Sequence, residues 1–242
     1  MVPLEGIPEL REGDDLAQAL HEAAQRVGGL EDGDVVVVAQ KAVSKVEGRV
    51  VRLADVEPSA RARELAGPDA DPRQLEVILR ESAEIVRSRP PLVIAETRHG
   101  FVCASAGVDA SNAPEEGTLV LLPLDPDASA RTLRDQLRDL AGIEVGVIVS
   151  DSFGRAWRQG TTDVALGVAG LAPLRDLRGT LDAAGRELQT TQIAVADEIA
   201  GAAELVLGKA AGIPAARVRG LDVHGDGRAA ELLMPRERDL FR

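Results

Sequence analysis

The chain has 242 residues, of which 45% are hydrophobic and 28% charged, a composition typical of a globular protein with a sizeable core. Forty acidic residues against 28 basic ones give a net charge of −12, which argues against a general nucleic-acid or anionic-membrane surface. No apolar run is long enough to span a bilayer, and the N-terminus does not resemble a signal peptide. One cysteine, Cys103, excludes an internal disulfide. We therefore expect a cytoplasmic protein with neither nucleic acid nor a membrane among its partners.

Helix-capping residues, prolines and apolar runs predict helices and strands along the whole chain. In chain order we expect a helix at 15–27, a strand at 35–38, helices at 59–66 and 72–89, strands at 92–95, 101–104 and 118–122, a helix at 128–140, strands at 145–149 and 161–168, a helix at 192–207 and a strand at 216–223. Because these elements do not alternate regularly, we expect a mixed α/β (α+β) fold rather than a doubly wound sheet. No Ser-, Gly- or Pro-rich linker divides the chain, so we expect one domain over residues 1–242, with its weakest seams at 67–69 and 123–127.

Several common site motifs are absent from the sequence. Gly208-Lys209 is followed by Ala210 and lacks the upstream glycine of a P-loop. A loose G-x-G-x-x-A pattern at 225–230 lies too near the C-terminus to open a dinucleotide-binding unit. No G-x-S-x-G nucleophile elbow occurs. A nucleotide site in this chain would have to be built from other elements.

The segment 105–112, SAGVDASN, follows a predicted strand and gathers Gly, Asp, Ser and Asn in one loop. The Asp109 carboxylate offers the hard oxygen ligands that Mg²⁺ and Mn²⁺ prefer, and Asn112 can both donate and accept hydrogen bonds. A turn with Asx hydrogen bonds explains the same residue types. The segment alone leaves both interpretations open.

The segment 150–160, SDSFGRAWRQG, follows another predicted strand. That strand delivers Asp151 and Ser152 at its carboxyl end, where α/β sheets tend to bind ligands. A carboxylate and a hydroxyl can hold a metal together, and Arg155 and Arg158 can clamp a phosphate or a carboxylate. The alternative is a strand-end turn with solvated arginines.

Lysine is rare in this chain and occurs only as Lys41, Lys45 and Lys209. Lys45, in the segment 44–49 (SKVEGR), suits a phosphate oxygen, although a solvated charge is the alternative. The glycine-bearing turn 207–214, LGKAAGIP, follows a predicted helix and is compatible with an ordinary helix cap. Acidic oxygens, a lysine, an arginine pair and glycine loops together suit Mg²⁺-nucleotide chemistry without a P-loop.

Six motifs in this chain resemble, in the same order, those of the coenzyme F420-0:L-glutamate ligase family. They are GD at 33–34 leading to SKVEGR at 44–49, AGVDASN at 106–112, LPLDPD at 122–127, DSFGRAWRQG at 151–160, GREL at 185–188 and ADEIA at 196–200. The resemblance runs from about residue 6 to residue 223. The common order of the motifs, rather than any single one, makes it specific.

The resemblance implies a GTP-dependent ligase that adds L-glutamate to coenzyme F420-0, a deazaflavin, through an acyl phosphate, giving F420-1. It implies Mg²⁺ or Mn²⁺, two per site, and allows a monovalent cation such as K⁺. It also implies a family-specific fold in an intertwined homodimer of two-lobed subunits, and we expect no C-terminal flavin reductase domain. By position it assigns the GTP site to Ile7, Pro8, Glu9, Leu10, Gln40, Lys45, Asn112, Leu207, Gly208, Lys209, Gly212 and Ile213.

The resemblance assigns the metals to Asp109, Asp151 and Ser152. The predicted catalytic residues are Asp109, Asp151, Arg155 and Arg158, the two arginines being assigned to a phosphate or carboxylate of the acceptor or of glutamate. Two positions depart from the family pattern. Gln40 stands where relatives usually have Ser or Thr, and Lys209 stands where some relatives place a metal-binding acid, so the ligands of the second metal are not assigned.

Two other functions stay open on the sequence alone. A metal-dependent phosphohydrolase would use Asp109 and Asp151 and would release phosphate from GTP without glutamate. A non-catalytic nucleotide- or deazaflavin-binding module would bind without turnover and would be indifferent to the loss of Asp151.

Overall fold

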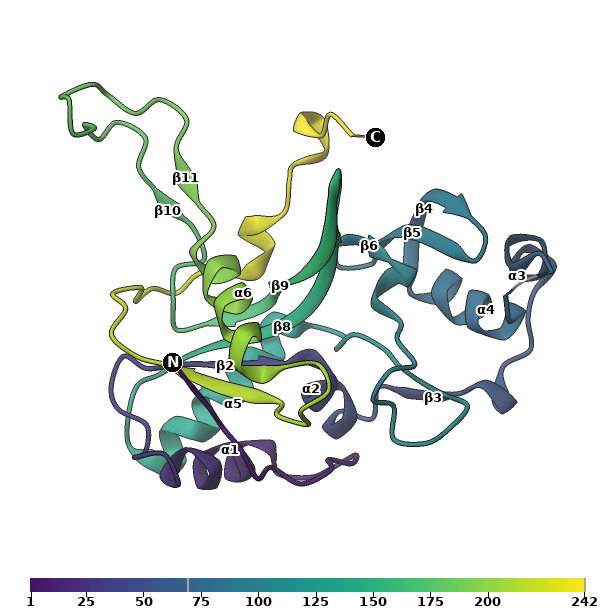
Figure 1. Cartoon of the computed structure of the whole chain (residues 1–242), viewed down its shortest axis with the longest axis horizontal. Coiled ribbons are helices and arrows are strands. Elements are labelled where there is room, and N and C mark those ends of the chain that lie inside the picture. The colour runs from purple at the N-terminus through teal and green to yellow at the C-terminus, as the bar shows by residue number, and fades with distance from the viewer. Residues whose placement is uncertain (69, 242) are drawn as a thin grey trace.

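The computed structural model describes residues 1–68 and 70–241; Asp69, in one of the predicted seams, and Arg242 lie outside the described residues. Helices and strands are mixed, which confirms the predicted mixed α/β class (Figure 1). The largest sheet has the strand order β1-β12-β2-β8-β9, in which β2 and β8 run parallel and the other neighbours antiparallel. Its strands are β1 (Val2–Pro3), β2 (Val35–Ala39), β8 (Gly146–Arg155), β9 (Arg158–Ala169) and β12 (Ala215–Val218).

Helices cover both faces of this sheet. Val36 and Val38 of β2 share a core with α1 (Leu16–Gln25) and α5 (Pro126–Ala141), whereas Val35 and Val37 share a core with α6 (Val195–Leu207). Figure 1 shows α6 on one side of the strands and α1 and α5 on the other. A strand buried on both faces has apolar residues at every position, which is the physical reason for the unbroken valine run.

The cores on the two faces of the large sheet together form the main core, and a second core forms around a smaller sheet of strand order β4-β5-β6. Its elements are α3 (Ala60–Ala66), α4 (Pro72–Glu81), β4 (Ser82–Arg89), β5 (Leu92–Thr97) and β6 (Val102–Ala104), and β3 (Val50–Arg52) pairs with β7 (Thr118–Val120) nearby. The helix predicted at 72–89 is therefore wrong beyond Glu81. Ser82 ends α4 by donating its hydroxyl to the carbonyl of Ile78, and the following residues pair with β5 instead.

Two of the further differences from the sequence prediction position the site. Residues 40–46, for which no helix was predicted, form α2 (Gln40–Val46) directly after β2. The strand expected to end before Ser150 continues to Arg155, because β9 returns along it as an antiparallel hairpin and pairs its backbone. Asp151 and Ser152 consequently lie within a strand rather than after it.

The remaining elements are short. They are η1 (Leu53–Asp55), η2 (Ser105–Gly107), η3 (Ala229–Leu232), η4 (Arg236–Arg238), β10 (Arg175–Asp176) and β11 (Gln192–Ile193). The β10–β11 pair carries an arm that extends away from the sheets (Figure 1). Among the described residues, no helix combines the length and the apolar character needed to cross a bilayer.

Gly167 of β9 lies against the start of α5. A Cβ atom at this position would fall 2.0 Å from the carbonyl oxygen of Pro126, and backbone atoms cannot turn aside as a side chain can. We expect Gly167→Ala to lower the free energy of unfolding by about 2 kcal/mol or more, measured by urea denaturation. Gly154→Ala is the matched control, because a Cβ on this glycine of β8 meets no atom within 4 Å. Equal midpoints for the two variants would contradict the packing described here.

Candidate functional site

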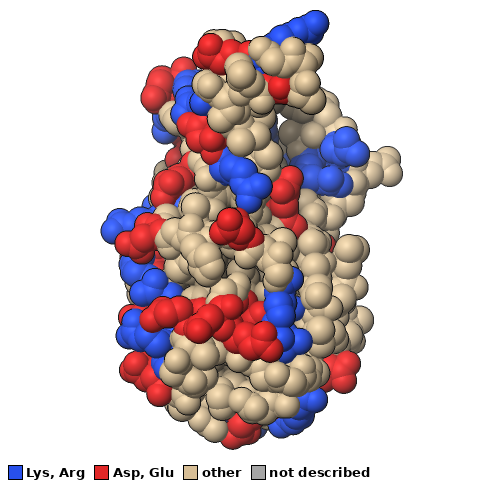
Figure 2. All heavy atoms as spheres, turned by 90° about the vertical axis from the view of Figure 1, so that its left-hand side faces the viewer, with Lys and Arg blue, Asp and Glu red and all other residues tan. Residues whose placement is uncertain are grey.

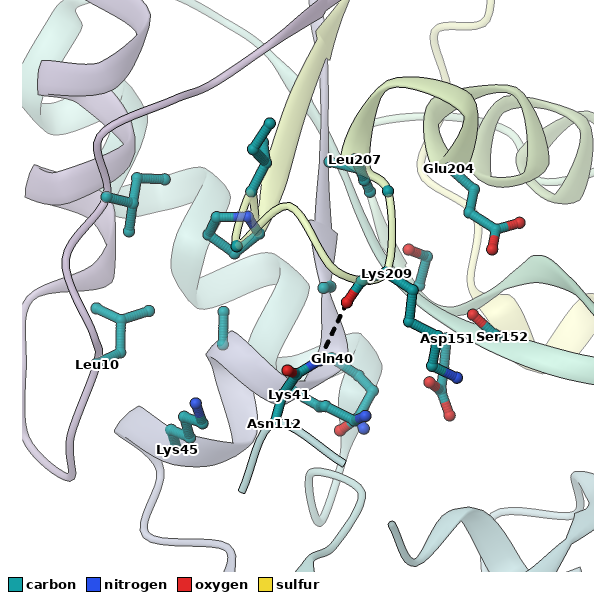
Figure 3. Close-up of a pocket in the computed structure, with 18 of the residues that line it drawn as sticks. Leu10, Gln40, Lys41, Lys45, Asn112, Asp151, Ser152, Glu204, Leu207 and Lys209 are labelled. Atoms are coloured by element: carbon teal, nitrogen blue, oxygen red, sulfur yellow. Dashed lines mark hydrogen bonds between the residues drawn. The ribbon is translucent and has the colours of Figure 1, made fainter. Parts of the chain in front are cut away.

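A cavity of about 370 Å³ lies at the carboxyl end of β2. β2 ends at Ala39, which pairs with Ser150, while β8 continues to Arg155. The edge of β8 that faces β2 is therefore free of that strand from Asp151 onward. Asp151 and Ser152 border the cavity from this edge, α2 borders it from another side, and the turn after α6 closes it (Figure 3).

The structure gathers most of the predicted site residues around this cavity. The residues assigned by position to a GTP site all border it, namely Ile7, Pro8, Glu9, Leu10, Gln40, Lys45, Asn112, Leu207, Gly208, Lys209, Gly212 and Ile213. Asp109 lies one side chain away, since its carboxylate accepts a hydrogen bond from the cavity residue Lys41. The segments from which these residues come are far apart in sequence, and the fold brings them to one place.

All three lysines of the chain border the cavity, although the other basic residues are arginines that lie elsewhere. Lys41 and Lys45 lie one turn apart on α2, and Lys209 lies in the turn after α6. A compact ammonium group carries its charge at one point and suits a phosphate oxygen. The cavity therefore concentrates positive charge in a protein whose net charge is −12.

Lys41 connects α2 to the loop between η2 and β7, which contains Asp109 and Ser111. Its Nζ lies 2.6 Å from Oδ2 of Asp109 and 2.7 Å from Oγ of Ser111. The Ser111 amide also donates to Oδ1 of Asp109, so the expected Asx turn is present together with the ion pair. Burial alone would raise the pKa of Asp109, but the hydrogen bonds from Lys41 and Ser111 outweigh it and lower this pKa.

Asp151 has the opposite electrostatic balance. Part of its surface stays accessible, yet protein atoms crowd the carboxyl group, and this burial raises its pKa to about 7. The Ser152 amide and the charge of Lys41 lower this pKa, whereas the carboxylates of Asp163 and Asp109 raise it further. Asp109 and Asp151 are thus close enough for their charges to interact.

The two residues of α2 that were assigned to GTP have different partners. Lys45 is held by Glu9, with 2.5 Å between Nζ and Oε1. Gln40 is almost fully buried and accepts a hydrogen bond from the hydroxyl of Ser44 through Oε1, but its Nε2 has no partner within the described structure. A buried amide donor without a partner is costly, so a ligand acceptor at the cavity would satisfy it.

A contact between distant segments closes the cavity on one side. Nδ2 of Asn112 lies 3.3 Å from the carbonyl oxygen of Lys209, which is 97 residues later in the chain (Figure 3). Asn112 has φ +54°, a left-handed conformation that asparagine tolerates better than most residues. Its Oδ1 accepts no hydrogen bond in the described structure and is left for a donor on a ligand.

Asp163, Glu204 and Ser150 also border the cavity and were not predicted from the sequence. Asp163 is buried and accepts hydrogen bonds from Ser150 and Ser152, at 2.8 Å and 2.7 Å. Glu204 comes from the last turns of α6, where its helix position alone indicates a surface charge. The available signal for Asp163 is a charged residue inside an apolar strand, but only the register of the hairpin shows what it faces.

Arg155 and Arg158 do not border the cavity. They lie at the far end of the β8–β9 hairpin, are exposed, and Arg155 donates to the carbonyl of Gln159. Between them Trp157 is 81% exposed and contacts Phe241, with 4.8 Å between the ring centroids. Both arginines keep the predicted role of binding an acceptor or glutamate only as a proposal for a substrate that extends beyond the cavity.

The donor set fits a hard divalent cation. Asp109, Asp151 and Ser152 offer oxygen ligands, and a bound cation would favour the charged form of Asp151, whose pKa is raised mainly by burial. Within the described residues, no three His, Cys, Asp or Glu side chains are grouped closely enough to hold a metal by themselves. Mg²⁺ commonly completes its shell with water and substrate phosphates, so this set suits a cation that arrives with a nucleotide.

The fold and cavity define a mixed α/β protein with a cavity lined by lysines and acidic side chains. The chain belongs to the family described as F420-0:Gamma-glutamyl ligase, whose profile matches residues 6–220. It is 45% identical to the coenzyme F420:L-glutamate ligase of Methanothermobacter thermautotrophicus, over 100% of this chain and 98% of that protein. The proteins of the same name from Methanopyrus kandleri and Archaeoglobus fulgidus are 48% and 44% identical, over 100% and 99% of this chain and 96% and 95% of their own lengths.

The raised pKa of Asp151 predicts a pH-dependent stability. A carboxyl group with pKa about 7 when folded, against 3.8 when unfolded, binds more protons in the folded state between these values, so stability falls as pH rises from about 4 through 7. In EDTA, Asp151→Asn should raise the free energy of unfolding at pH 8 by on the order of 1–4 kcal/mol and change it little at pH 4. Urea denaturation of both proteins across this range measures it, and parallel pH profiles would contradict the assignment.

Proposed function

We propose that this protein is a GTP-dependent ligase that joins L-glutamate to coenzyme F420-0, giving F420-1, GDP and phosphate, as a step of coenzyme F420 biosynthesis. The observation that carries the proposal is the convergence of all three lysines with Asp151 on one cavity. Family membership supplies the acceptor, because the relatives are named coenzyme F420:L-glutamate ligases. The choice of GTP rests on the family resemblance of the motifs.

The chemistry requires activation of a carboxylate, since its leaving group would otherwise be oxide. An oxygen of the terminal carboxylate of F420-0 attacks the γ-phosphorus of GTP, and GDP leaves. The amine of L-glutamate then attacks the acyl carbon, phosphate leaves, and the amine nitrogen gives up a proton. For such a transfer the protein mainly positions the reactants and balances their charge.

The chain's own residues support these roles. Lys45 of α2 would contact a phosphate once it leaves Glu9. Lys41 on the same helix and Lys209 after α6 would add positive charge. The free Nε2 of Gln40 is available to a phosphate or carbonyl oxygen of the nucleotide. Arg155 and Arg158 would bind the carboxylates or phosphate of a substrate that extends along the hairpin.

Divalent cations belong to the proposal. Asp109, Asp151 and Ser152 would hold Mg²⁺ or Mn²⁺, two per site, which when bound neutralise phosphate charge. K⁺ is a further candidate as a monovalent cation. Before a cation binds, Lys41 holds Asp109 in position through the ion pair between its ammonium group and the carboxylate.

An intertwined homodimer of two-lobed subunits is also proposed. The two separate cores are compatible with two lobes. The arm that carries β10 and β11 exposes Leu181, and the tip of the β8–β9 hairpin exposes Trp157. Leu240, near the C-terminus, is exposed as well. Exposed apolar groups on extended arms favour burial against another chain.

Ligation should depend on L-glutamate and on Asp151. With F420-0, GTP and Mn²⁺, we expect the deazaflavin product to be heavier by one glutamyl unit, and phosphate release to require glutamate. Asp151→Ala should lower the turnover rate at least about 100-fold, because the carboxylate that would hold a charge-neutralising cation is lost. Mass spectrometry and a phosphate assay measure the two quantities.

Asp139→Ala removes an exposed carboxylate of α5 and serves as the matched control with unchanged activity. Phosphate release that ignores glutamate would instead indicate a phosphohydrolase. Nucleotide binding without turnover, indifferent to Asp151, would indicate a binding module. Thermal melting of each variant separates a loss of activity from a loss of fold.

Lys45 and Glu9 should act in opposite directions on nucleotide affinity. Lys45→Met removes a charged donor, and we expect the Kd for GTP to rise about 10- to 100-fold by calorimetric titration. Glu9→Gln removes the carboxylate that competes for the same ammonium group, so it should leave the Kd unchanged or lower it. An unchanged Kd in Lys45→Met would show that Lys45 does not bind the nucleotide, and a weaker affinity in Glu9→Gln would show that Glu9 does not compete for Lys45.

A further inference from the structure

Asp163 lies on β9 directly opposite Ser152 of β8. Its side chain is 5% exposed and accepts two hydrogen bonds, from the hydroxyl of Ser150 to Oδ2 and from that of Ser152 to Oδ1. Both serines therefore lie on the same face of the strand, two residues apart. One carboxylate thus orients the two hydroxyls that flank Asp151 in sequence.

In the described structure no lysine, arginine or histidine forms an ion pair with Asp163. A buried carboxylate without a cationic partner is costly, and two neutral hydroxyls offset only part of that cost. Asp163 also borders the cavity beside Asp151. The arrangement therefore suits positive charge that is supplied from the cavity.

The geometry at Ser152 determines what its oxygen can do. A serine hydroxyl has one proton and two acceptor lone pairs. Because the proton points to Asp163, the lone pairs of Oγ are left for a cation or a donor in the cavity. A carboxylate that accepts the proton also makes the oxygen a stronger ligand, as partners behind metal ligands commonly do.

We propose that Asp163 is a positioning residue, which fixes the hydroxyl of Ser152 as an acceptor ligand for a divalent cation in the cavity. The inference rests on the proposed function for the presence of that cation. Ser150 has the same bond to Asp163 but lies beside the end of β2, where it pairs with Ala39 and is 1% exposed. Ser152 lies beyond that end and is partly exposed.

The two serines form a matched pair for the test. Each serine-to-alanine change removes one hydrogen bond to Asp163. Both serines border the cavity, but Ser150 is almost fully buried beside β2, whereas Ser152 is partly exposed and can meet a cation. The full chain is titrated with Mn²⁺ in the presence of GDP, and free Mn²⁺ is followed by electron paramagnetic resonance. We expect Ser152→Ala to weaken Mn²⁺ affinity at least about 10-fold and Ser150→Ala less than about 2-fold.

Asp163→Asn should also weaken Mn²⁺ affinity at least about 10-fold, because an amide accepts through one atom and donates through the other. Thermal midpoints are recorded for all variants, and if Asp163→Asn does not fold, the serine pair still decides the question. Equal losses in the two serine variants, no loss in Ser152→Ala, or no Mn²⁺ binding by the unaltered protein would overturn the proposal. Glutamate ligation is measured separately, so its failure beside an intact serine asymmetry would overturn the proposed function alone.

Discussion

The site depends on the unequal lengths of two parallel strands. β2 stops at Ala39 and turns at once into α2, while its parallel neighbour β8 continues for five residues beyond the last pair because β9 supports its other edge. The missing stretch of β2 leaves the space that becomes the cavity. Successive side chains of the freed β8 edge point to opposite faces of the sheet, so Asp151 and Ser152 face different partners from adjacent positions. Shortening β8 to the length of β2 would remove both.

Charge is organised differently in the cavity and on the outside. On the face shown in Figure 2, acidic and basic side chains are interspersed, so no broad field of one sign is evident there. In the cavity the lysines come together, and two of them are already paired, Lys41 with Asp109 and Lys45 with Glu9. These pairs keep the ammonium groups in place without a ligand. An incoming polyanion would replace the carboxylates as partner of the two lysines, and its cations would replace the lysines as partners of the carboxylates. The charged side chains are already in place, so this exchange costs less free energy than bringing unpaired charges together in the cavity.

Short-range sequence patterns predicted those elements whose formation depends on residues close together in the chain. The valine run and the Asp71-Pro72 start of α4 each act within a few residues, and each lies where the sequence predicts. The helix predicted at 128–140 begins two residues earlier, after the cap at Asp125. The end of α4 cannot be predicted from the local pattern, because Ile85 and Val86 continue the apolar face of the helix. These residues form a strand because the segment pairs with β5. The role of Asp163 could not be predicted either, because it too depends on pairing between strands. Its partners depend on a hairpin register that the sequence of β9 alone does not reveal.

The placement of Asp109 against Asp151 depends on how the two cores meet. Ala106 and Val108, just before Asp109, pack in the second core, whereas Asp151 belongs to the main sheet. Arg49 ties the two parts together by donating to the carboxylate of Glu81 and to the carbonyl of Leu122, and Lys41 reaches across to Asp109. Any ligand that engages both aspartates must therefore also fix the distance between the cores. Ligand binding and the internal geometry of the chain would then be coupled, and a bound cation would replace Lys41 as the partner of Asp109.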